Sequence, residues 1–382
     1  LRRYPQVDLL CGPGELDKLP MLIDNVVRTS ASTDDQATEA GRVALAGNTS
    51  RRSAALSATK DDLETLDLAR AFDPDQATSA ARSAYVRITR GCNKFCTYCV
   101  VPYTRGAEES RPAASILAEA ERLAAQGVRE ITLLGQNVNA YHGDAPNGAE
   151  GTWNLATLLK ALSGIDGLER LRFTTSHPKD MDEDLYQAFA DNPKLMPYLH
   201  LPVQSGSDPI LKAMNRSHSA AEYIDIIKRL RSIRPDMAIS GDFIVGFPGE
   251  SDQDFADTLK IITEVNYAQA YSFKYSPRPG TPAANVEFHV PEDVKSKRLE
   301  SLQHLLNEQQ HAFNLSCVGQ TMSVLLERDG KEDGQLIGRS PYMQSVHVMA
   351  PKHRLGQIID VEITSGGPNS LKGQILMAQD AA

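Results

Sequence analysis

The sequence lacks the features that mark several large classes of protein. It has no run of about 18 apolar residues, so no membrane-spanning helix is predicted and no membrane partner is expected. Leu1–Tyr4 is not followed by an apolar stretch, which argues against a secretory signal peptide. Only five cysteines occur in 382 residues, too few for a disulfide scaffold. A net charge of −9 excludes a strongly basic nucleic-acid coat protein, although it does not exclude a local basic surface.

The composition that is present indicates a globular protein of more than one domain. A hydrophobic content of 41% allows a sizeable core, and 382 residues suffice for two or three domains. Residues 1–28 show a short strand pattern at 7–10 and an amphipathic helix pattern at 15–27, and cannot bury a core alone. Residues 29–79 are rich in Ala, Ser, Thr, Asp and Gln without a sustained period, so we expect a poorly ordered linker there.

From residue 80 onward, strand patterns alternate with helix patterns. The expected strands are 84–89, 130–134, 170–174, 198–201, 238–245 and 270–275. The expected helices are 115–126, 155–162, 183–190, 220–233, 252–264 and 291–315. Strands separated by helices require parallel crossovers, so residues 80–315 are predicted to form an α/β barrel or a doubly wound sheet.

The last part of the chain, residues 316–382, contains short strand patterns only. They lie at 321–327, 335–338, 345–349, 357–363 and 371–376, with glycines between them. Five strands in so short a segment predict a small β-barrel of the OB-like kind. The segment has six Lys and Arg against seven Asp and Glu, a net charge of −1, so charge alone does not indicate RNA binding.

Three of the five cysteines fall within one short loop. Cys92, Cys96 and Cys99 form a C-x3-C-x2-C pattern directly after the first expected strand of the α/β region. Cysteine thiolates hold iron–sulfur clusters, and three of them leave one iron of a [4Fe–4S] cluster open. An open iron can chelate S-adenosylmethionine, and electron transfer to the sulfonium then yields a 5′-deoxyadenosyl radical. Tyr98 offers an aromatic face to the adenine of that cofactor.

Two other interpretations of the cysteines have to be weighed. A zinc site would need a fourth ligand such as His142 or His177, and three purely structural thiols would need none. The spacing favours the iron–sulfur cluster over both. Cys11 and Cys317 have no partner at ligand spacing, so we expect each to be a small buried residue.

Several longer motifs accompany the cysteines. They are Gly91–Gly106, Leu133–Asn139, Arg172–Pro178, His200–Asp208, Asp242–Glu250 and Ser276–Ala283. With these motifs the chain resembles the radical S-adenosylmethionine methylthiotransferases of the MiaB type, over essentially its whole length except the linker. The resemblance implies a partial (β/α)6 barrel of parallel strands over 80–315, followed by a TRAM domain, a small RNA-binding β-barrel, over 316–382.

The resemblance and the strand exits together indicate a pocket for S-adenosylmethionine. Polar residues follow five successive expected strands, where parallel barrels place their chemistry. The candidates for cofactor binding are Tyr98, Gly135, Gln136, Asn137, Ser176, Gln204, Arg216 and Gly246. Three alternatives stay open: loops that satisfy their own backbone, a solvated helix-face role for Arg216, and ordinary close packing at Gly246.

A second group of residues is a candidate for contact with RNA or substrate. Its members are Arg105, Arg111, Arg339, Tyr342, Lys352 and Arg354. The basic side chains would clamp phosphate and Tyr342 would stack on a base, as in OB-like barrels. For Arg105 and Arg111 a surface salt bridge is an equal alternative. For the others the sequence alone favours a solvated loop, whereas the resemblance to the TRAM domain favours contact with RNA.

The implied activity is methylthiolation of C2 of N6-isopentenyladenosine beside the anticodon of tRNA, in the cytoplasm. It would use S-adenosylmethionine and a low-potential electron donor such as flavodoxin or ferredoxin. The alternatives are methylthiotransferases acting on N6-threonylcarbamoyladenosine or on a ribosomal-protein aspartate, an iron–sulfur electron carrier, and an RNA-binding protein. A carrier would cap all four irons, and no fourth clustered cysteine is present.

One departure from the family pattern concerns the beginning of the chain. The family carries three more cysteines in an N-terminal domain, where they hold a second [4Fe–4S] cluster that handles the inserted sulfur. Residues 1–28 resemble only the end of that domain, and Cys11 does not match any of the three positions. We therefore expect the second cluster to have no ligands in this chain and its cysteines to lie upstream of Leu1.

Overall fold

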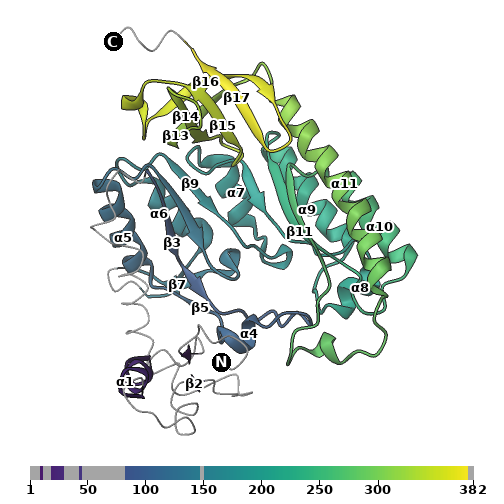
Figure 1. Cartoon of the computed structure of the whole chain (residues 1–382). Coiled ribbons are helices and arrows are strands. Elements are labelled where there is room, and N and C mark those ends of the chain that lie inside the picture. The colour runs from purple at the N-terminus through teal and green to yellow at the C-terminus, as the bar shows by residue number, and fades with distance from the viewer. Residues whose placement is uncertain (1–8, 12–18, 30–42, 45–81, 147–149, 377–382) are drawn as a thin grey trace. The chain divides into compact units, whose positions relative to one another are not determined.

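The computed structural model describes residues 9–11, 19–29, 43–44, 82–146 and 150–376 (Figure 1). The chain divides into two compact units, which we describe separately. The smaller unit comprises Leu1–Gln76, Arg90–Phe95 and Cys99–Glu109, and the larger comprises Ala77–Thr89, Cys96–Tyr98 and Ser110–Ala382. Among the described residues, no helix has the length and apolar character needed to span a membrane.

The smaller unit contains a short parallel sheet and two helices among its described residues. Strand β1 (Leu10–Cys11) pairs with β2 (Val43–Ala44), and the helices are α1 (Leu19–Thr29) and α4 (Val101–Thr104). The predicted strand at 7–10 and helix at 15–27 overlap β1 and α1, but their first residues lie outside the described ranges. Strand β2 falls inside the expected linker, residues 29–79. Apart from β2 and Thr29, the expected linker lies outside the described ranges.

Six parallel strands form the framework of the larger unit. They are β3 (Ser83–Arg87), β6 (Glu130–Leu134), β9 (Arg170–Phe173), β10 (Tyr198–His200), β11 (Ala238–Val245) and β12 (Gln269–Lys274). They pair in the orders β3-β6-β9 and β10-β11-β12. The Leu171 N–H donates to the Lys194 carbonyl at 2.7 Å, and the Met196 N–H donates to the Leu171 carbonyl at 3.0 Å, which links the two sheets. The strands therefore follow one another in chain order, as in a partial barrel.

Helices connect these strands and cover one face of them (Figure 1). They are α5 (Ala113–Ala125), α6 (Leu155–Ser163), α7 (Glu183–Asp191), α9 (Ala220–Ile233), α10 (Asp252–Val265) and α11 (Glu292–Ser316). Capping boxes at Ser219 and Ser251 fix the first turns of α9 and α10. The α/β region of the sequence prediction is confirmed, and each of its helix and strand boundaries lies within about two residues of the observed one.

Several short elements of the α/β region are absent from the sequence prediction. They are α8 (Asp208–Ala213), β4 (Thr89–Arg90), β5 (Glu109–Ser110), β7 (His142–Asp144) and β8 (Thr152–Asn154). Elements of two to six residues are too short to establish a hydrophobic period, so the pattern could not reveal them.

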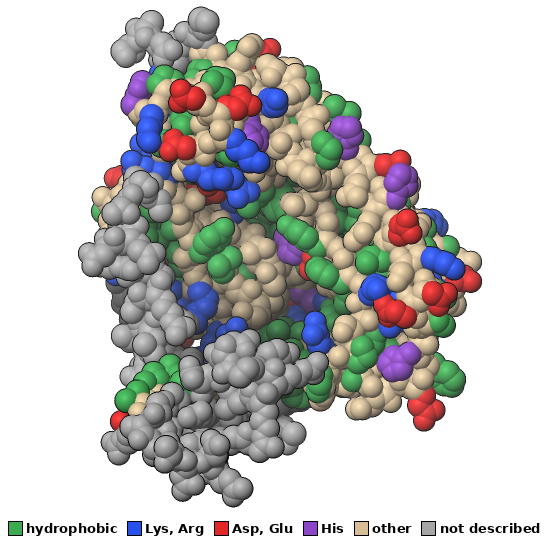
Figure 2. Space-filling view, in the orientation of Figure 1, with side chains coloured by type: hydrophobic (Ala, Val, Ile, Leu, Met, Phe, Trp, Pro, Cys, Tyr) green, Lys and Arg blue, Asp and Glu red, His purple; other side chains and the backbone are tan. Residues whose placement is uncertain are grey.

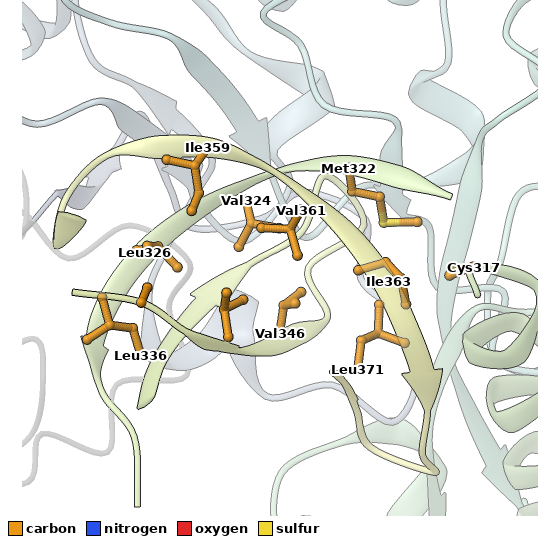
Figure 3. Packing of buried hydrophobic residues seen from close by; sticks show 12 residues of the cluster. Cys317, Met322, Val324, Leu326, Leu336, Val346, Ile359, Val361, Ile363 and Leu371 are labelled. Atoms are coloured by element: carbon orange, nitrogen blue, oxygen red, sulfur yellow. The ribbon is translucent and has the colours of Figure 1, made fainter. Parts of the chain in front are cut away.

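The chain ends in a closed β-barrel, the TRAM-like barrel of the prediction. Its strands are β13 (Thr321–Asp329), β14 (Gln335–Arg339), β15 (Ser345–Met349), β16 (Ile358–Gly366) and β17 (Ser370–Ile375), in the closed order β13-β14-β15-β17-β16. Figure 3 shows the aliphatic side chains that fill it. Cys317 belongs to this core and is 2% exposed, which confirms its expected role as a small buried residue. Burial raises the pKa of its thiol.

A buried ionic network joins the β-barrel to the parallel strands. The Glu130 carboxylate, at the start of β6, lies 3.5 Å from Arg170 and 3.0 Å from Arg172 of β9. Arg170 also donates to the Ser323 and Arg339 carbonyls, at 2.5 and 3.1 Å. Arg172 donates to two carbonyls of the turn after β14, at 2.7 and 2.9 Å. Although burial lowers the pKa of Arg170 to about 10, its charge is retained at neutral pH.

Replacing Glu130 with alanine should strongly destabilise the larger unit. The substitution leaves two buried guanidinium groups without their carboxylate, which costs about 3–5 kcal/mol. The matched control is Glu169→Ala, because the ion pair of Glu169 with Arg129 is about 40% exposed and contributes less than about 1 kcal/mol. Urea unfolding measures the free energy of unfolding of both variants. Equal losses of stability in the two variants would contradict the role given to the ionic network.

Candidate functional site

The cysteine loop begins with a turn that only glycine can make. Gly91 has a φ of +73°, and a Cβ there would lie 1.9 Å from the Ala107 carbonyl oxygen. The backbone N–H of Cys92 then donates to the Gly106 carbonyl at 3.3 Å. Cys92 and Cys99 are half-buried, and neither is joined in a disulfide. The glycines at both ends of the first cysteine motif thus shape this loop.

The middle of the loop, Cys96–Tyr98, is anchored on the end of α8. The Thr97 N–H donates to the Met214 carbonyl at 3.0 Å, and its hydroxyl donates to the Ala213 carbonyl at 2.8 Å. The Thr97 carbonyl accepts the Ala283 N–H at 3.0 Å. Both sides of Thr97 are therefore held by backbone groups, which fixes the direction of Cys96.

Arg216 lies beside the middle cysteine. One of its terminal nitrogens donates to Cys96 Sγ at 3.7 Å, and the other donates to the Pro202 carbonyl at 2.5 Å. The alternative of a solvated helix-face arginine is therefore wrong, because Arg216 is partly buried and occupied on both sides. The contact with Arg216 therefore fixes the position of the Cys96 sulfur.

The expected cluster and the alternative zinc site differ in the donors that they require. Over the described ranges, no three His, Cys, Asp or Glu side chains are arranged to hold one ion. Of the two possible zinc ligands, His142 is exposed, and His177 accepts the Lys179 N–H at 3.2 Å. A [4Fe–4S] cluster binds each thiolate on a different iron, so it does not require the sulfurs to converge on one point.

The polar residues after β6 and β9 are tied to one another. The Val138 N–H donates to the Thr175 carbonyl at 2.9 Å, and the Asn137 amide donates to Asp180 at 2.9 Å. Asn139 was not predicted as a site residue. Its amide oxygen accepts the His177 N–H at 2.8 Å, and its amide nitrogen donates to the His177 carbonyl at 2.9 Å. The two strand exits therefore form one rigid rim.

The two candidate glycines both make close contacts within the protein. A Cβ on Gly135 would lie 1.9 Å from Thr89 Oγ1, and one on Gly246 would lie 2.3 Å from Lys295 Cγ. The aliphatic chain of Lys295 fills the space beside Gly246, which supports the alternative of ordinary close packing at this glycine. Gln204 has a φ of +78° and bridges to β11, so its strained backbone belongs to the same rim.

Besides the two ring nitrogens of His218, four buried polar atoms near the strand exits have no hydrogen-bond partner among the described residues. They are Thr89 Oγ1, Ser176 Oγ, Arg216 Nε and the Tyr275 hydroxyl. Buried polar groups are nearly always hydrogen-bonded, so such a set indicates a polar ligand at this end of the strands. S-adenosylmethionine, with its ribose hydroxyls and amino and carboxylate groups, fits this requirement. Of the four residues, Ser176 and Arg216 were candidates from the sequence, whereas Thr89 and Tyr275 were not, although each is the last residue of an expected strand and that position is a usable signal.

Tyr98 lies against an apolar wall. It packs with Ile244 on a cluster made of Ile210, Met214, Phe247, Tyr275 and Ala283. The Phe247 and Tyr275 rings meet edge to face at 5.3 Å between centroids. Such a wall suits the flat, weakly polar face of adenine, and the aromatic role of Tyr98 stays a prediction.

His218 is a buried histidine next to the rim. It is 6% exposed, and its ring meets that of His177 edge to face at 5.7 Å. Burial lowers its pKa to about 3, with Arg216 and Lys179 acting in the same direction and Glu222 opposing them. The ring is therefore neutral at physiological pH.

This histidine should make the protein sensitive to acid. The pKa of His218 is about 6.5 in the unfolded chain and about 3 in the folded protein. Between these two pH values the unfolded state binds a proton at this ring and the folded state does not, so acid favours unfolding. The unfolding free energy should fall by about 2 kcal/mol between pH 7 and pH 5 through this group. Urea unfolding of the His218→Gln variant should show a decrease in unfolding free energy between pH 7 and pH 5 that is smaller by about 2 kcal/mol. An unchanged pH dependence would contradict the role given to His218.

The candidates for RNA contact are not equally accessible. Arg339 pairs with Glu327 at 3.3 Å, and Lys352, which is 79% exposed, pairs with Asp329 at 3.3 Å. Arg354 donates to Gln357 at 3.0 Å, and Arg105 is exposed. These side chains can exchange a weak partner for phosphate.

Two of those candidates need correction. Arg111 is 9% exposed and forms a buried ion pair with Glu119 at 2.8 Å, so it is a structural residue. Tyr342 packs its ring edge to face on Phe313 and joins the β-barrel core, where burial raises its pKa to about 12. A ring held in this way is not a platform for stacking a base.

Comparisons with known proteins agree with this architecture. Residues 86–262 match the Radical SAM superfamily, and residues 315–376 match the TRAM domain. The cysteine loop on parallel strands, followed by a closed β-barrel, thus defines a radical S-adenosylmethionine protein with a TRAM domain. The chain is 51% identical over 384 residues to the tRNA-2-methylthio-N6-dimethylallyladenosine synthase of Maricaulis maris (strain MCS10), covering 100% of this chain and 78% of that protein. It belongs to this family of synthases. Membership implies a [4Fe–4S] cluster and S-adenosylmethionine.

Solved structures with a similar arrangement are much more distant. Coproporphyrinogen III oxidase from Escherichia coli has a TM-score of 0.43 at 15% identity, over 75% of this chain and 70% of that one. The methyltransferase TsrM from Kitasatospora setae also has a TM-score of 0.43, at 17% identity, over 53% of this chain and 38% of that one. The assignment to the family does not depend on them.

Proposed function

We propose that the protein adds a methylthio group to C2 of N6-dimethylallyladenosine in tRNA. The observation that carries this proposal is the 51% identity over the whole chain to a synthase of that name. Cys92, Cys96 and Cys99 are the proposed ligands of three irons in a [4Fe–4S] cluster with one open iron. Arg216 holds the sulfur of Cys96 in place, because its guanidinium donates to that sulfur.

The strand exits are the proposed site of S-adenosylmethionine. When bound, the cluster and this cofactor supply the one-electron cleavage of a carbon–sulfur bond. The protein holds and orients the cofactor. Tyr98 and the apolar wall face its adenine, and the hydroxyls of Ser176 and Thr89 bind the polar groups of S-adenosylmethionine. Gly135, Gln136 and Asn137 shape the rim that surrounds the cofactor, together with Gln204.

The domain limits proposed from the sequence are kept. Residues 80–315 are the radical S-adenosylmethionine core and residues 316–382 the TRAM domain, which contacts tRNA through Arg339, Lys352 and Arg354. Residues 1–28 are the end of an N-terminal domain, and residues 29–79 a linker. Deleting the TRAM domain is a poor test of RNA binding, because Arg170 and Arg172 would lose the carbonyls that they bind there.

Two further requirements follow from the proposed reaction. A second [4Fe–4S] cluster would hold the inserted sulfur. A low-potential donor such as flavodoxin or ferredoxin would supply the electron. Because tRNA is the substrate, the cytoplasm is the proposed location.

The proposal can be tested with three substrates offered in parallel. These are anticodon stem-loops bearing N6-dimethylallyladenosine or N6-threonylcarbamoyladenosine, and a ribosomal-protein peptide. The reconstituted protein, given S-adenosylmethionine and a strong reductant, should form 5′-deoxyadenosine fastest with the dimethylallyl RNA. Binding of that RNA should weaken with added salt, because phosphate contacts release counterions. Preference for either other substrate would overturn the proposed function.

A further inference from the structure

The parallel strands enclose a pocket that the proposed cofactor site does not use. We call it the lumen pocket. Its volume is about 410 Å³, within the range of about 300–1,000 Å³ that is usual for ligand sites. It is lined by Tyr85, Thr132, Arg172, Phe173, Thr174, Tyr198, His200, Asp242, Gln269, Tyr271, Phe273, Arg339 and Met343. Figure 2 shows hydrophobic side chains inside this hollow and Lys and Arg side chains at its upper edge, below the β-barrel.

Three aromatic side chains in the lumen pocket are unusually exposed. Tyr85 is 66% exposed, Tyr271 48% and Phe273 55%. They come from β3 and β12, the first and last of the six parallel strands, and their neighbours Val86 and Ser272 point the other way. Exposed aromatic side chains that line a hollow are characteristic of a binding site and not of a solvent-facing strand.

Hydrogen bonds hold part of this aromatic surface in place. The Gln269 amide donates to the Tyr271 hydroxyl at 3.1 Å and accepts from the Tyr198 hydroxyl at 3.3 Å. The Tyr271 ring meets the His200 ring edge to face at 6.3 Å. A surface that is fixed before binding loses little freedom when an apolar group packs on it.

The lumen pocket adjoins the proposed cofactor site along β11. Asp242 lines the pocket, and Ile244, two residues further on the same face, belongs to the apolar wall that carries Tyr98. Two residues of strand span about 7 Å, so an occupant of the pocket lies next to that wall.

The charges in the pocket disfavour an anionic occupant. Arg172 is already paired with the buried Glu130 at 3.0 Å, so of the lining arginines only Arg339, whose contact with Glu327 at 3.3 Å is partly exposed, can exchange its partner for phosphate. The Asp242 carboxylate lies 3.6 Å from His200 Nε2 and adds negative charge to the pocket. A neutral, apolar group meets no such penalty.

We propose that Tyr85, Tyr271 and Phe273 bind the dimethylallyl group of the substrate base and so determine its specificity. This inference rests on the proposed function and adds the residues that distinguish the modified base from plain adenosine. The dimethylallyl group packs on the three rings, while the base lies toward the apolar wall. Since each methylene in a hydrophobic pocket changes binding about tenfold or more, the five-carbon group has enough surface for strong discrimination.

The test measures binding by the protein without added cofactors. Two anticodon stem-loops that differ only in having adenosine or N6-dimethylallyladenosine are titrated by fluorescence anisotropy. The unsubstituted protein should prefer the dimethylallyl RNA by about tenfold or more, and Tyr271→Ala and Phe273→Ala should each remove most of that preference. Affinity for the adenosine RNA should stay within about twofold, because that RNA does not fill the aromatic surface.

Four further results decide the outcome. Tyr271→Phe should keep the preference, because the ring face remains. Phe288→Ala, a matched change at a residue that is 77% exposed and outside the pocket lining, should also keep it. If the alanine variants at Tyr271 and Phe273 retain the preference, or lose affinity for both RNAs equally, the inference is wrong while the proposed function stands. If the unsubstituted protein forms 5′-deoxyadenosine only with the ribosomal peptide, the proposed function itself is wrong.

Discussion

Alanine at any one of Cys92, Cys96 or Cys99 is expected to abolish the brown iron–sulfur absorbance of anaerobically reconstituted protein, and with it the cleavage of S-adenosylmethionine. Each thiolate binds a different iron, so two remaining ligands cannot hold a site-differentiated cluster. Absorption spectra, iron analysis and chromatography of 5′-deoxyadenosine measure the loss. Activity should fall to background for all three variants.

The controls are the two cysteines outside the loop. Cys317→Ala should keep the absorbance, because its thiol is buried in the β-barrel core, and should cost only about 1 kcal/mol of stability. Cys11→Ala should also keep it. Zinc copurifying in a one-to-one ratio, with the absorbance unchanged in the three loop variants, would contradict the cluster assignment.

A polypeptide of residues 1–382 is expected to bind about four irons and not about eight, and to split S-adenosylmethionine without forming a methylthio product. Only three of its five cysteines have cluster spacing, which suffices for one [4Fe–4S] cluster. Product formation also needs a sulfur held near C2 of the base, and that positioning is proposed to come from the second cluster. The expected change in product yield is therefore complete loss.

Iron analysis and mass spectrometry of digested tRNA measure both quantities in one preparation. The matched control is Cys96→Ala, which should yield neither 5′-deoxyadenosine nor product. Catalytic formation of methylthiolated adenosine by residues 1–382 alone would show that the sulfur has another carrier. The proposed need for a second cluster would then be wrong.

Much of the fold follows from local patterns in the sequence. The boundaries of β6 and β11 agree closely with prediction, because alternating or continuous apolar residues between turn residues specify a strand locally. The short helix α8 could not be found in this way, although it anchors the cysteine loop through Met214. Its six residues contain less than two helical turns, too few for a period to appear.

The roles of individual site residues were predicted less well. Arg111 and Tyr342 were expected to contact RNA, but one is paired with Glu119 and the other packs on Phe313. A sequence shows that a residue is basic or aromatic, yet only the fold decides whether an acid or another ring lies beside it. The same applies to Arg216, whose neighbour Cys96 is 120 residues away in the chain.

The sequence by itself determined the order of strands and helices, the closing β-barrel and the three-cysteine loop, because each depends on residues close together in the chain. Tertiary structure alone decided which faces of the strands are open. Tyr85 and Phe273 alternate with their neighbours as any strand residues do, and nothing local distinguishes a ring in a core from a ring in a hollow. Tyr85 and Phe273 are exposed because β3 and β12 lie at opposite ends of the strand order. The described side chains leave a pocket open between these two strands.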